Sequence, residues 1–158
     1  MKKLINDPFD AVDEMLVRAR AAGVAWMVCV GTDLATSLAA IEIAGRHEDV
    51  YATVGLHPHD ASKLGAQWSE LEPLARDERV VGIGEAGFDL YYEHSPRDEQ
   101  ETAFRMQVRL GMEQSIGRRL MKGQHVRHRP IPQAVVFPYH RLQRTREIAA
   151  LFPAESGK

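Results

Sequence analysis

The sequence has a single cysteine, Cys29, among its 158 residues, and it has no run of about 18 apolar residues. A disulfide within the chain is therefore excluded, and no transmembrane helix is predicted. Lys2 and Lys3 are not followed by an apolar segment, so the start does not resemble a secretory signal. These absences favour a soluble cytoplasmic protein without membrane partners, in which Cys29 is a small buried apolar residue.

A nucleotide-binding signature is also missing, since no GxxxxGK[ST] pattern occurs anywhere in the chain. A nucleotide-binding sheet therefore has little support from the sequence.

The net charge of −2 conceals two parts of opposite character. Residues 1–110 contain 11 basic and 19 acidic side chains, whereas residues 111–158 contain 9 basic and 3 acidic ones. Periodic apolar patterns end near Gly111, and prolines and arginines become frequent beyond it. We therefore expect one folded domain over residues 1–110 and a basic tail over residues 111–158, poorly ordered or with a short helix.

Within the first part, helical periodicity alternates with short continuous apolar runs. The expected helices are Asp10–Ala22, Leu34–Arg46, Trp68–Arg76 and Pro96–Leu110, and the expected strands are Val24–Val30, Val50–Val54 and Val80–Ile83. Continuous apolar strands that alternate with helices predict an α/β fold with a parallel sheet. The alternation alone fits both a closed barrel and an open, doubly wound sheet.

Each predicted strand ends at a glycine that is followed at once by polar side chains. Thr32 and Asp33 follow the first strand, His57 and His59 the second, and Glu85 the third. Because the carboxyl ends of parallel strands lie at one edge of a sheet, we expect one site there.

Glu85 has two interpretations. At the end of a buried strand it can ligate a hard divalent cation or act as a general base. It can equally cap nearby backbone amides. His57 and His59, as alternate residues of an extended segment, can both face the site and bind a metal ion or a phosphate, or they can bond to the loop backbone. Asp33 and Asp60 are better explained as helix caps.

The segment Ala86–Ser95 is predicted to be a long loop with Tyr91, Tyr92 and His94 in it. Its aromatic side chains can stack on nucleic-acid bases, or they can pack the loop onto the rim of the fold. Ser95 is the predicted N-cap of the next helix, with Asp98 closing a capping box.

The segments GLHPH, GEAGFD and HSPR occur in this order within residues 10–110, and together they resemble the TatD family of metal-dependent deoxyribonucleases. The resemblance implies a (β/α)8 TIM barrel of the metal-dependent hydrolase type and hydrolysis of phosphodiester bonds of DNA. It implies a two-metal centre, with Mg, Mn or Zn as the cation. Glu85 matches the metal-binding glutamate of the family and His57 a histidine that lines its site, with His59 as a further substrate-binding candidate.

Other family features have no counterpart here. The opening His-x-His strand is missing, and the later metal-binding histidine would fall near Met121, where no apolar strand occurs. About 250 residues are needed for a full barrel. We therefore expect an incomplete barrel, a truncated form of low or no activity without an assignable catalytic residue, and self-association through uncovered sheet edges. The alternatives are nucleic-acid binding by the basic tail and a different amidohydrolase-like reaction.

Overall fold

The structure of the chain, a computed structural model, describes residues 10–114. Its elements, in chain order, are α1 (Asp10–Ala21), β1 (Met27–Val30), α2 (Leu34–Arg46), β2 (Val50–Val54), the 3-10 helix η1 (Pro58–Lys63), α3 (Leu64–Leu74), β3 (Val80–Ile83) and α4 (Arg97–Glu113). The predicted tail elements lie outside the described residues. None of the helices in residues 10–114 has the length and apolar character needed to cross a bilayer.

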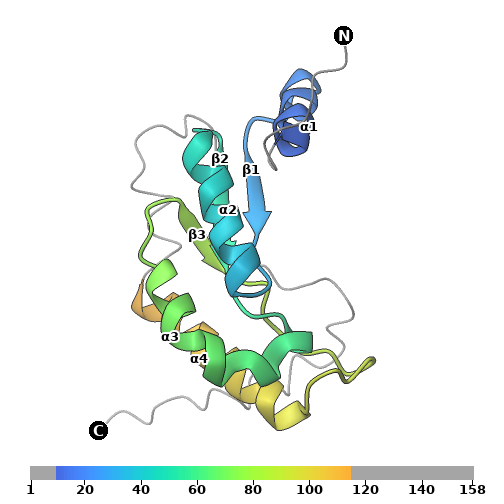
Figure 1. Cartoon of the computed structure of the whole chain (residues 1–158), viewed down its shortest axis with the longest axis vertical. Coiled ribbons are helices and arrows are strands. Elements are labelled where there is room, and N and C mark those ends of the chain that lie inside the picture. The colour runs from blue at the N-terminus through green and yellow to red at the C-terminus, as the bar shows by residue number, and fades with distance from the viewer. Residues whose placement is uncertain (1–9, 115–158) are drawn as a thin grey trace, which may run out of the picture.

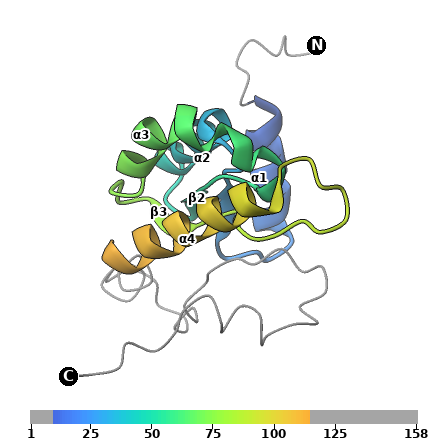
Figure 2. The same cartoon turned by 90° about the horizontal axis from the view of Figure 1, so that it is seen from below.

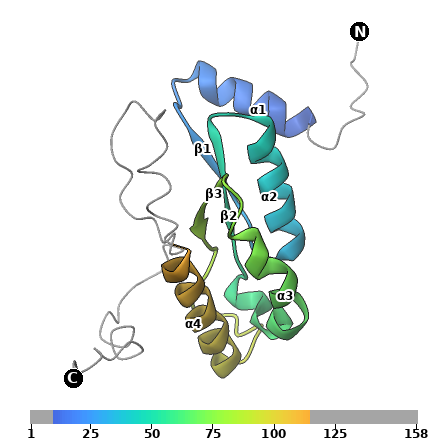
Figure 3. The ribbon, with the colours of Figure 1, turned by 90° about the vertical axis from the view of Figure 1, so that its left-hand side faces the viewer.

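The three strands form one parallel sheet in the order β1-β2-β3. Figure 1 shows α1 near the start of β1, whereas η1 and the loop after β3 lie at the other end of the sheet. The helix α2 runs along one face of the sheet (Figure 3) and packs on β1 and β2, and α4 contacts β3 and η1. This parallel alternation confirms the predicted α/β architecture and fits an incomplete TIM barrel.

The core is built mainly from small and β-branched residues. Ala40 and Ala44 on α2 lie against Val50 and Val54 on β2, and all four are almost completely buried. Small side chains let the helix approach the sheet closely. On α2, Leu38 is 49% exposed, and the buried face is formed by Ser37, Ala40 and Ala44. On α1, likewise, Met15 is exposed and Leu16 is buried.

Element boundaries differ from the prediction at three places. The strand β1 begins at Met27 rather than Val24, because Met27 pairs with Val50, the first residue of β2, so earlier residues have no strand to pair with. Cys29 in this strand is half-buried rather than fully buried as expected. The helix α3 begins at Leu64 and ends before Arg76. It begins earlier than predicted because Leu64 packs against a buried cluster that includes Leu71. Figure 2 shows α3 beside α2. The last helix continues past Gly111 to Glu113.

Two predicted caps are wrong and one is confirmed. Asp33 caps α2 in a capping box with Thr36. Ser95 does not cap α4; the capping position is Pro96, and the Ser95 hydroxyl is used to hold η1 instead. Asp60 lies inside the first turn of η1, where it pairs with Lys63 rather than capping.

Candidate functional site

The carboxyl ends of the three strands are joined by backbone hydrogen bonds. The Gly31 amide donates to the Thr53 carbonyl at 3.1 Å and the Glu85 amide to the Gly31 carbonyl at 2.7 Å, while the Gly84 amide donates to Val54 at 2.9 Å. One further bond, from the His57 amide to the Thr32 carbonyl at 2.8 Å, joins the first two loops. The polar residues that follow each strand are therefore brought to one edge, as the sequence predicts.

Glycine is required where the strand ends approach one another. A Cβ atom on Gly55 would lie 2.6 Å from the carbonyl carbon of Gly84, and one on Gly31 would lie 2.7 Å from the Cα atom of Ser37. Both distances are shorter than any real Cβ contact, so a side chain at Gly55 would push the ends of β2 and β3 apart, and one at Gly31 would push the end of β1 away from α2. The two glycines thus allow the close contact on which the site depends.

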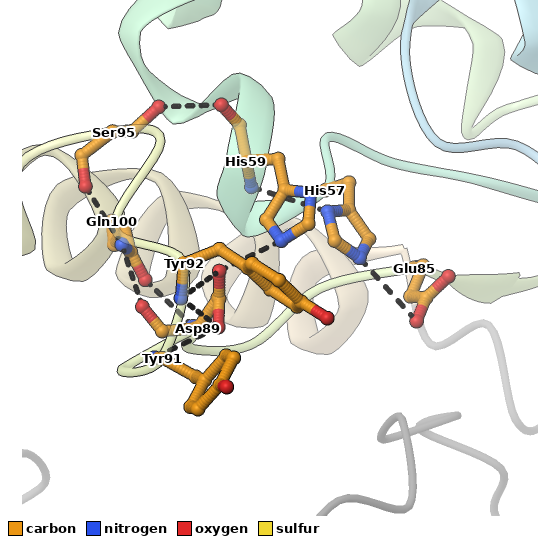
Figure 4. A network of polar contacts seen from close by, with 8 residues as sticks. All are labelled: His57, His59, Glu85, Asp89, Tyr91, Tyr92, Ser95 and Gln100. Carbon is orange, nitrogen blue, oxygen red and sulfur yellow. Dashed lines mark hydrogen bonds and ion pairs between the residues drawn. The ribbon is translucent and has the colours of Figure 1, made fainter.

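His57 lies next to Glu85 (Figure 4), with Nε2 at 3.6 Å from the carboxylate oxygen Oε1. Its other ring nitrogen, Nδ1, accepts a hydrogen bond from the His59 amide at 3.1 Å, so in the neutral ring the proton is on Nε2 and faces Glu85. Burial lowers the pKa of His57, although the nearby Glu85 carboxylate acts in the opposite direction. His57 is therefore a neutral N–H donor directed at Glu85.

His59 interacts with a different carboxylate. Its Nε2 atom lies 2.7 Å from Oδ2 of Asp89, and its ring makes an edge contact with that of His57 at a centroid distance of 4.4 Å. Burial would raise the pKa of Asp89, but the backbone amides of Tyr91 and Tyr92 and the His59 ring outweigh it, and the pKa is lowered. Asp89 is thus an ionised acceptor that orients His59.

Three side chains hold this site together in roles that the sequence does not predict. Gln100, buried in α4, accepts from the Asp89 amide and donates to the carbonyls of Asp89 and Ser95. Gln107, one heptad later, accepts from the Leu56 amide at 2.8 Å and donates to the Leu56 carbonyl at 3.0 Å. Ser95 donates to the His59 carbonyl at 2.7 Å.

A sequence signal for the two glutamines does exist. Seven residues separate them, so they share the helix face that also carries Phe104, which is buried. Uncharged polar residues on an apolar helix face usually have buried partners.

The contacts of Glu85, His57 and the loop tyrosines bear on the alternative roles of these residues. Among residues 10–114, no backbone amide donates to the Glu85 carboxylate, so the capping interpretation has no support there. His57 does bond to the loop backbone, but through one nitrogen alone. Of the two tyrosines in the 86–95 loop, Tyr91 is 83% exposed, and Tyr92, which is 63% exposed, touches the rim through an edge contact with the ring of His59.

The donor atoms in this site are too few for a complete metal centre. In the part of the chain that the structure describes, no three His, Cys, Asp or Glu side chains converge in a way that could hold a metal ion. Zinc sites usually have three or four protein ligands, whereas Mg²⁺ is commonly held by one or two carboxylates together with waters and substrate phosphates. Glu85, with His57 beside it, can supply only part of such a set.

Comparisons with known proteins point to one family. A model of the family described as TatD related DNase matches residues 3–116. The 3'-5' ssDNA/RNA exonuclease TatD of Cronobacter sakazakii is 46% identical over 102 residues, which are 64% of this chain and 39% of the relative. The corresponding protein of Klebsiella pneumoniae is 42% identical over the same share of each chain.

A Bacillus subtilis relative, the uncharacterized metal-dependent hydrolase YabD, is 36% identical over 105 residues, or 65% of this chain and 40% of the relative. The chain thus spans about two fifths of the length of these curated relatives. Because the family match covers more than two thirds of the sequence and includes all three strand ends, the chain belongs to the TatD related DNase family.

Proposed function

We propose that the site at the strand ends is part of the active site of a metal-dependent hydrolase that acts on phosphodiester bonds of nucleic acid. The observation that supports this most directly is the position of the Glu85 carboxylate beside the His57 imidazole, 3.6 Å apart. Two relatives are named as exonucleases of single-stranded DNA and RNA, and a third as a metal-dependent hydrolase. The proposal includes the cytoplasmic location that the sequence favours.

In this proposal Glu85 is one ligand of a divalent cation, magnesium, manganese or zinc, and the histidines bind the substrate. The Nε2–H group of His57 can donate to a phosphate oxygen, because its Nδ1 atom is already engaged by the backbone. His59 is oriented by Asp89 and lies next to His57. No residue is assigned as the proton donor or the nucleophile.

Metal binding by this chain alone should be weak. Among the described residues Glu85 is the one ligand assigned to the cation, and affinity falls steeply when ligands of a metal site are missing. We expect a dissociation constant for Mn²⁺ on the order of 10⁻³ M, comparable to the weakest oxygen-ligand sites of proteins. We accordingly expect little or no nuclease activity from the chain by itself.

Paramagnetic broadening by Mn²⁺ in a ¹H–¹⁵N NMR titration tests the metal assignment. The amide signals of Glu85 and His57 should broaden first, and Glu85→Gln should abolish this effect. Glu78→Gln is the matched control, because Glu78 is an exposed glutamate just before the same strand, at the opposite end from the site. Broadening that persists in Glu85→Gln would show that the cation is bound elsewhere.

A nuclease assay tests the expected low activity. A 5'-labelled single-stranded oligonucleotide is incubated with the chain and Mg²⁺, and the products are resolved by length. Robust cleavage that disappears in Glu85→Ala would contradict the expectation and would assign full activity to this chain.

The charge of residues 111–158 supports one alternative, a non-catalytic nucleic-acid-binding protein. Nine basic and three acidic side chains give that part a net charge of +6. Binding of this kind depends on counterion release, so affinity for an oligonucleotide should fall steeply as salt rises. Absent or salt-insensitive binding would reject the alternative.

A further inference from the structure

We propose that Tyr91, Tyr92 and His94, here called the aromatic platform, stack against the unpaired terminal base of a single-stranded nucleic acid. The inference rests on the proposed function, because it assumes that a phosphate of the same strand is bound at His57 and His59. The aromatic platform adds a base-binding part to that site. It lies on a loop whose aromatic residues have no role in the proposed metal binding.

The rings of the platform are arranged around one another and next to the histidines. Tyr92 is parallel to His94, with an interplanar angle of 2° and centroids 5.8 Å apart. Tyr91 stands at 86° to Tyr92 at a centroid distance of 4.7 Å, so the two tyrosine rings form a corner. His59 makes edge contacts with both His94, at 4.6 Å, and Tyr92, at 5.7 Å.

These rings are exposed although the loop that carries them is fixed. The Asp89 carboxylate accepts hydrogen bonds from the amides of Tyr91 and Tyr92, at 3.0 and 3.2 Å, and Gln100 anchors both ends of the segment from Asp89 to Ser95. Figure 4 shows this network, with Asp89 between the tyrosine backbone and His59. A loop held by so many bonds needs no exposed aromatic rings for its own stability.

One carboxylate positions both parts of the site. Asp89 bonds to His59 through Oδ2 and to the amides of both tyrosines. His59 in turn makes an edge contact with His57, so the His57 imidazole offered to phosphate and the rings offered to a base are held next to one another. In a nucleotide one sugar joins phosphate and base, so neighbouring groups of these two kinds suit a nucleotide better than an aliphatic or peptide ligand.

The occupant should be unpaired. Aromatic side chains stack on bases of any sequence when the face of the base is free, as it is in a single strand or at a strand end. Within a duplex both faces are covered by neighbouring base pairs. The platform therefore selects single strands or frayed ends without reading sequence.

Fluorescence anisotropy with an eight-residue deoxyadenylate strand, in EDTA to prevent cleavage, tests the proposal. Replacing a stacking ring by alanine should weaken binding about tenfold, so we expect this loss for Tyr92→Ala. Tyr92→Phe should bind like the unchanged chain because it keeps the ring. Leu90→Ala is the control, since Leu90 is 58% exposed in the same loop but has no ring.

A second probe with abasic residues at both ends identifies the group that is recognised. It should bind the unchanged chain about tenfold more weakly than the intact strand does, and Tyr92→Ala should cause no further loss. Equal binding of both probes to the unchanged chain, or of the intact strand to the chain and Tyr92→Ala, would overturn the platform.

NMR separates failure of the platform from failure of the proposed function. Titration with deoxyadenosine monophosphate should shift the ring protons of Tyr91 and Tyr92 upfield, whereas ribose 5-phosphate should not. Absence of these shifts would overturn the platform even if Mn²⁺ binds at Glu85. Shifts without Mn²⁺ binding at Glu85 would support the platform and reject the metal site.

Discussion

At the scale of single residues, Gln107 illustrates how the site depends on a side chain that has no chemical role in it. It is 1% exposed and forms two hydrogen bonds with the backbone of Leu56, the residue before His57. An amide side chain is needed there because it can accept and donate at once. It therefore fixes the backbone on which His57 is placed.

We predict that Gln107→Leu lowers the free energy of unfolding by about 2–4 kcal/mol, because it leaves a buried amide and a buried carbonyl of Leu56 without partners. Urea denaturation monitored by circular dichroism measures this change. Met112→Leu, at a position 73% exposed on the same helix, should change it by less than about 0.5 kcal/mol. A similarly small effect for Gln107→Leu would show that the two hydrogen bonds between Gln107 and Leu56 are dispensable for stability.

Residue types at the site were more predictable than their partners. The sequence predicts that Glu85, His57 and His59 face one edge, because glycine-ended strands place them there. It does not predict that Asp89 orients His59, since the two are 30 positions apart in the chain and meet only when the 86–95 loop folds back (Figure 4). Roles of Glu85, His57 and His59 in metal and substrate binding stay predictions.

At the scale of elements, α2 shows local rules that hold in the folded protein. The Asp33 side chain accepts from the Thr36 amide at 2.8 Å, and the Thr36 hydroxyl accepts from the Asp33 amide at 2.9 Å. The hydrogen bond from the Thr36 side chain is the main cause that lowers the pKa of Asp33. The cap thus favours the ionised carboxylate.

We predict that Asp33→Ala lowers the free energy of unfolding by about 1 kcal/mol at pH 7. The pKa of Asp33 is lower in the folded than in the unfolded protein. The contribution of the ionised carboxylate to stability is therefore fully present above the unfolded pKa, near 3.9. This contribution is lost as the pH falls through the folded pKa. Denaturation curves measured from pH 7 to pH 3 test the sign.

Asp33→Asn is the control for this pH dependence, because asparagine caps a helix but does not titrate. The difference in the free energy of unfolding between Asp33→Asn and the unchanged chain should shrink as the pH falls. A difference that stays constant with pH would show that the charge of Asp33 does not contribute.

The longer loop elements illustrate the opposite case. Sequence rules place the cap of α4 at Ser95, and the structure uses that hydroxyl to bind the His59 carbonyl and the Ser62 amide instead. Local capping rules would pair the Ser95 hydroxyl with an amide of its own helix. In the folded protein it instead has two hydrogen-bond partners in η1. The η1 helix itself has no apolar period and was not expected.

At the scale of the whole molecule, the described sheet leaves an apolar edge open. Among residues 10–114 no strand pairs with the outer edge of β1, and Trp26 and Val30 there are 38% and 41% exposed. Val17 on the adjoining helix α1 is 60% exposed. Open edges of this kind favour pairing with another chain.

We predict that the chain self-associates through this edge, and that Val30→Lys weakens the association at least about tenfold, because a lysine at an edge strand opposes pairing. Sedimentation velocity at several concentrations measures the change. Leu38→Lys, at a position 49% exposed on α2, should leave self-association as it is. Equal effects of both substitutions would mean that the β1 edge is not the interface.

The sequence alone determined the alternation of helices and parallel strands, the Asp33 cap and the edge at which Glu85, His57 and His59 lie, because these follow from local periodicity and from strand polarity. Only the tertiary structure decided which carboxylate faces which histidine, how Gln100 and Gln107 hold the loops, and that the tyrosines are exposed. These features depend on contacts between segments far apart in the chain. Local patterns carry no information about such contacts until the sheet has brought the segments together.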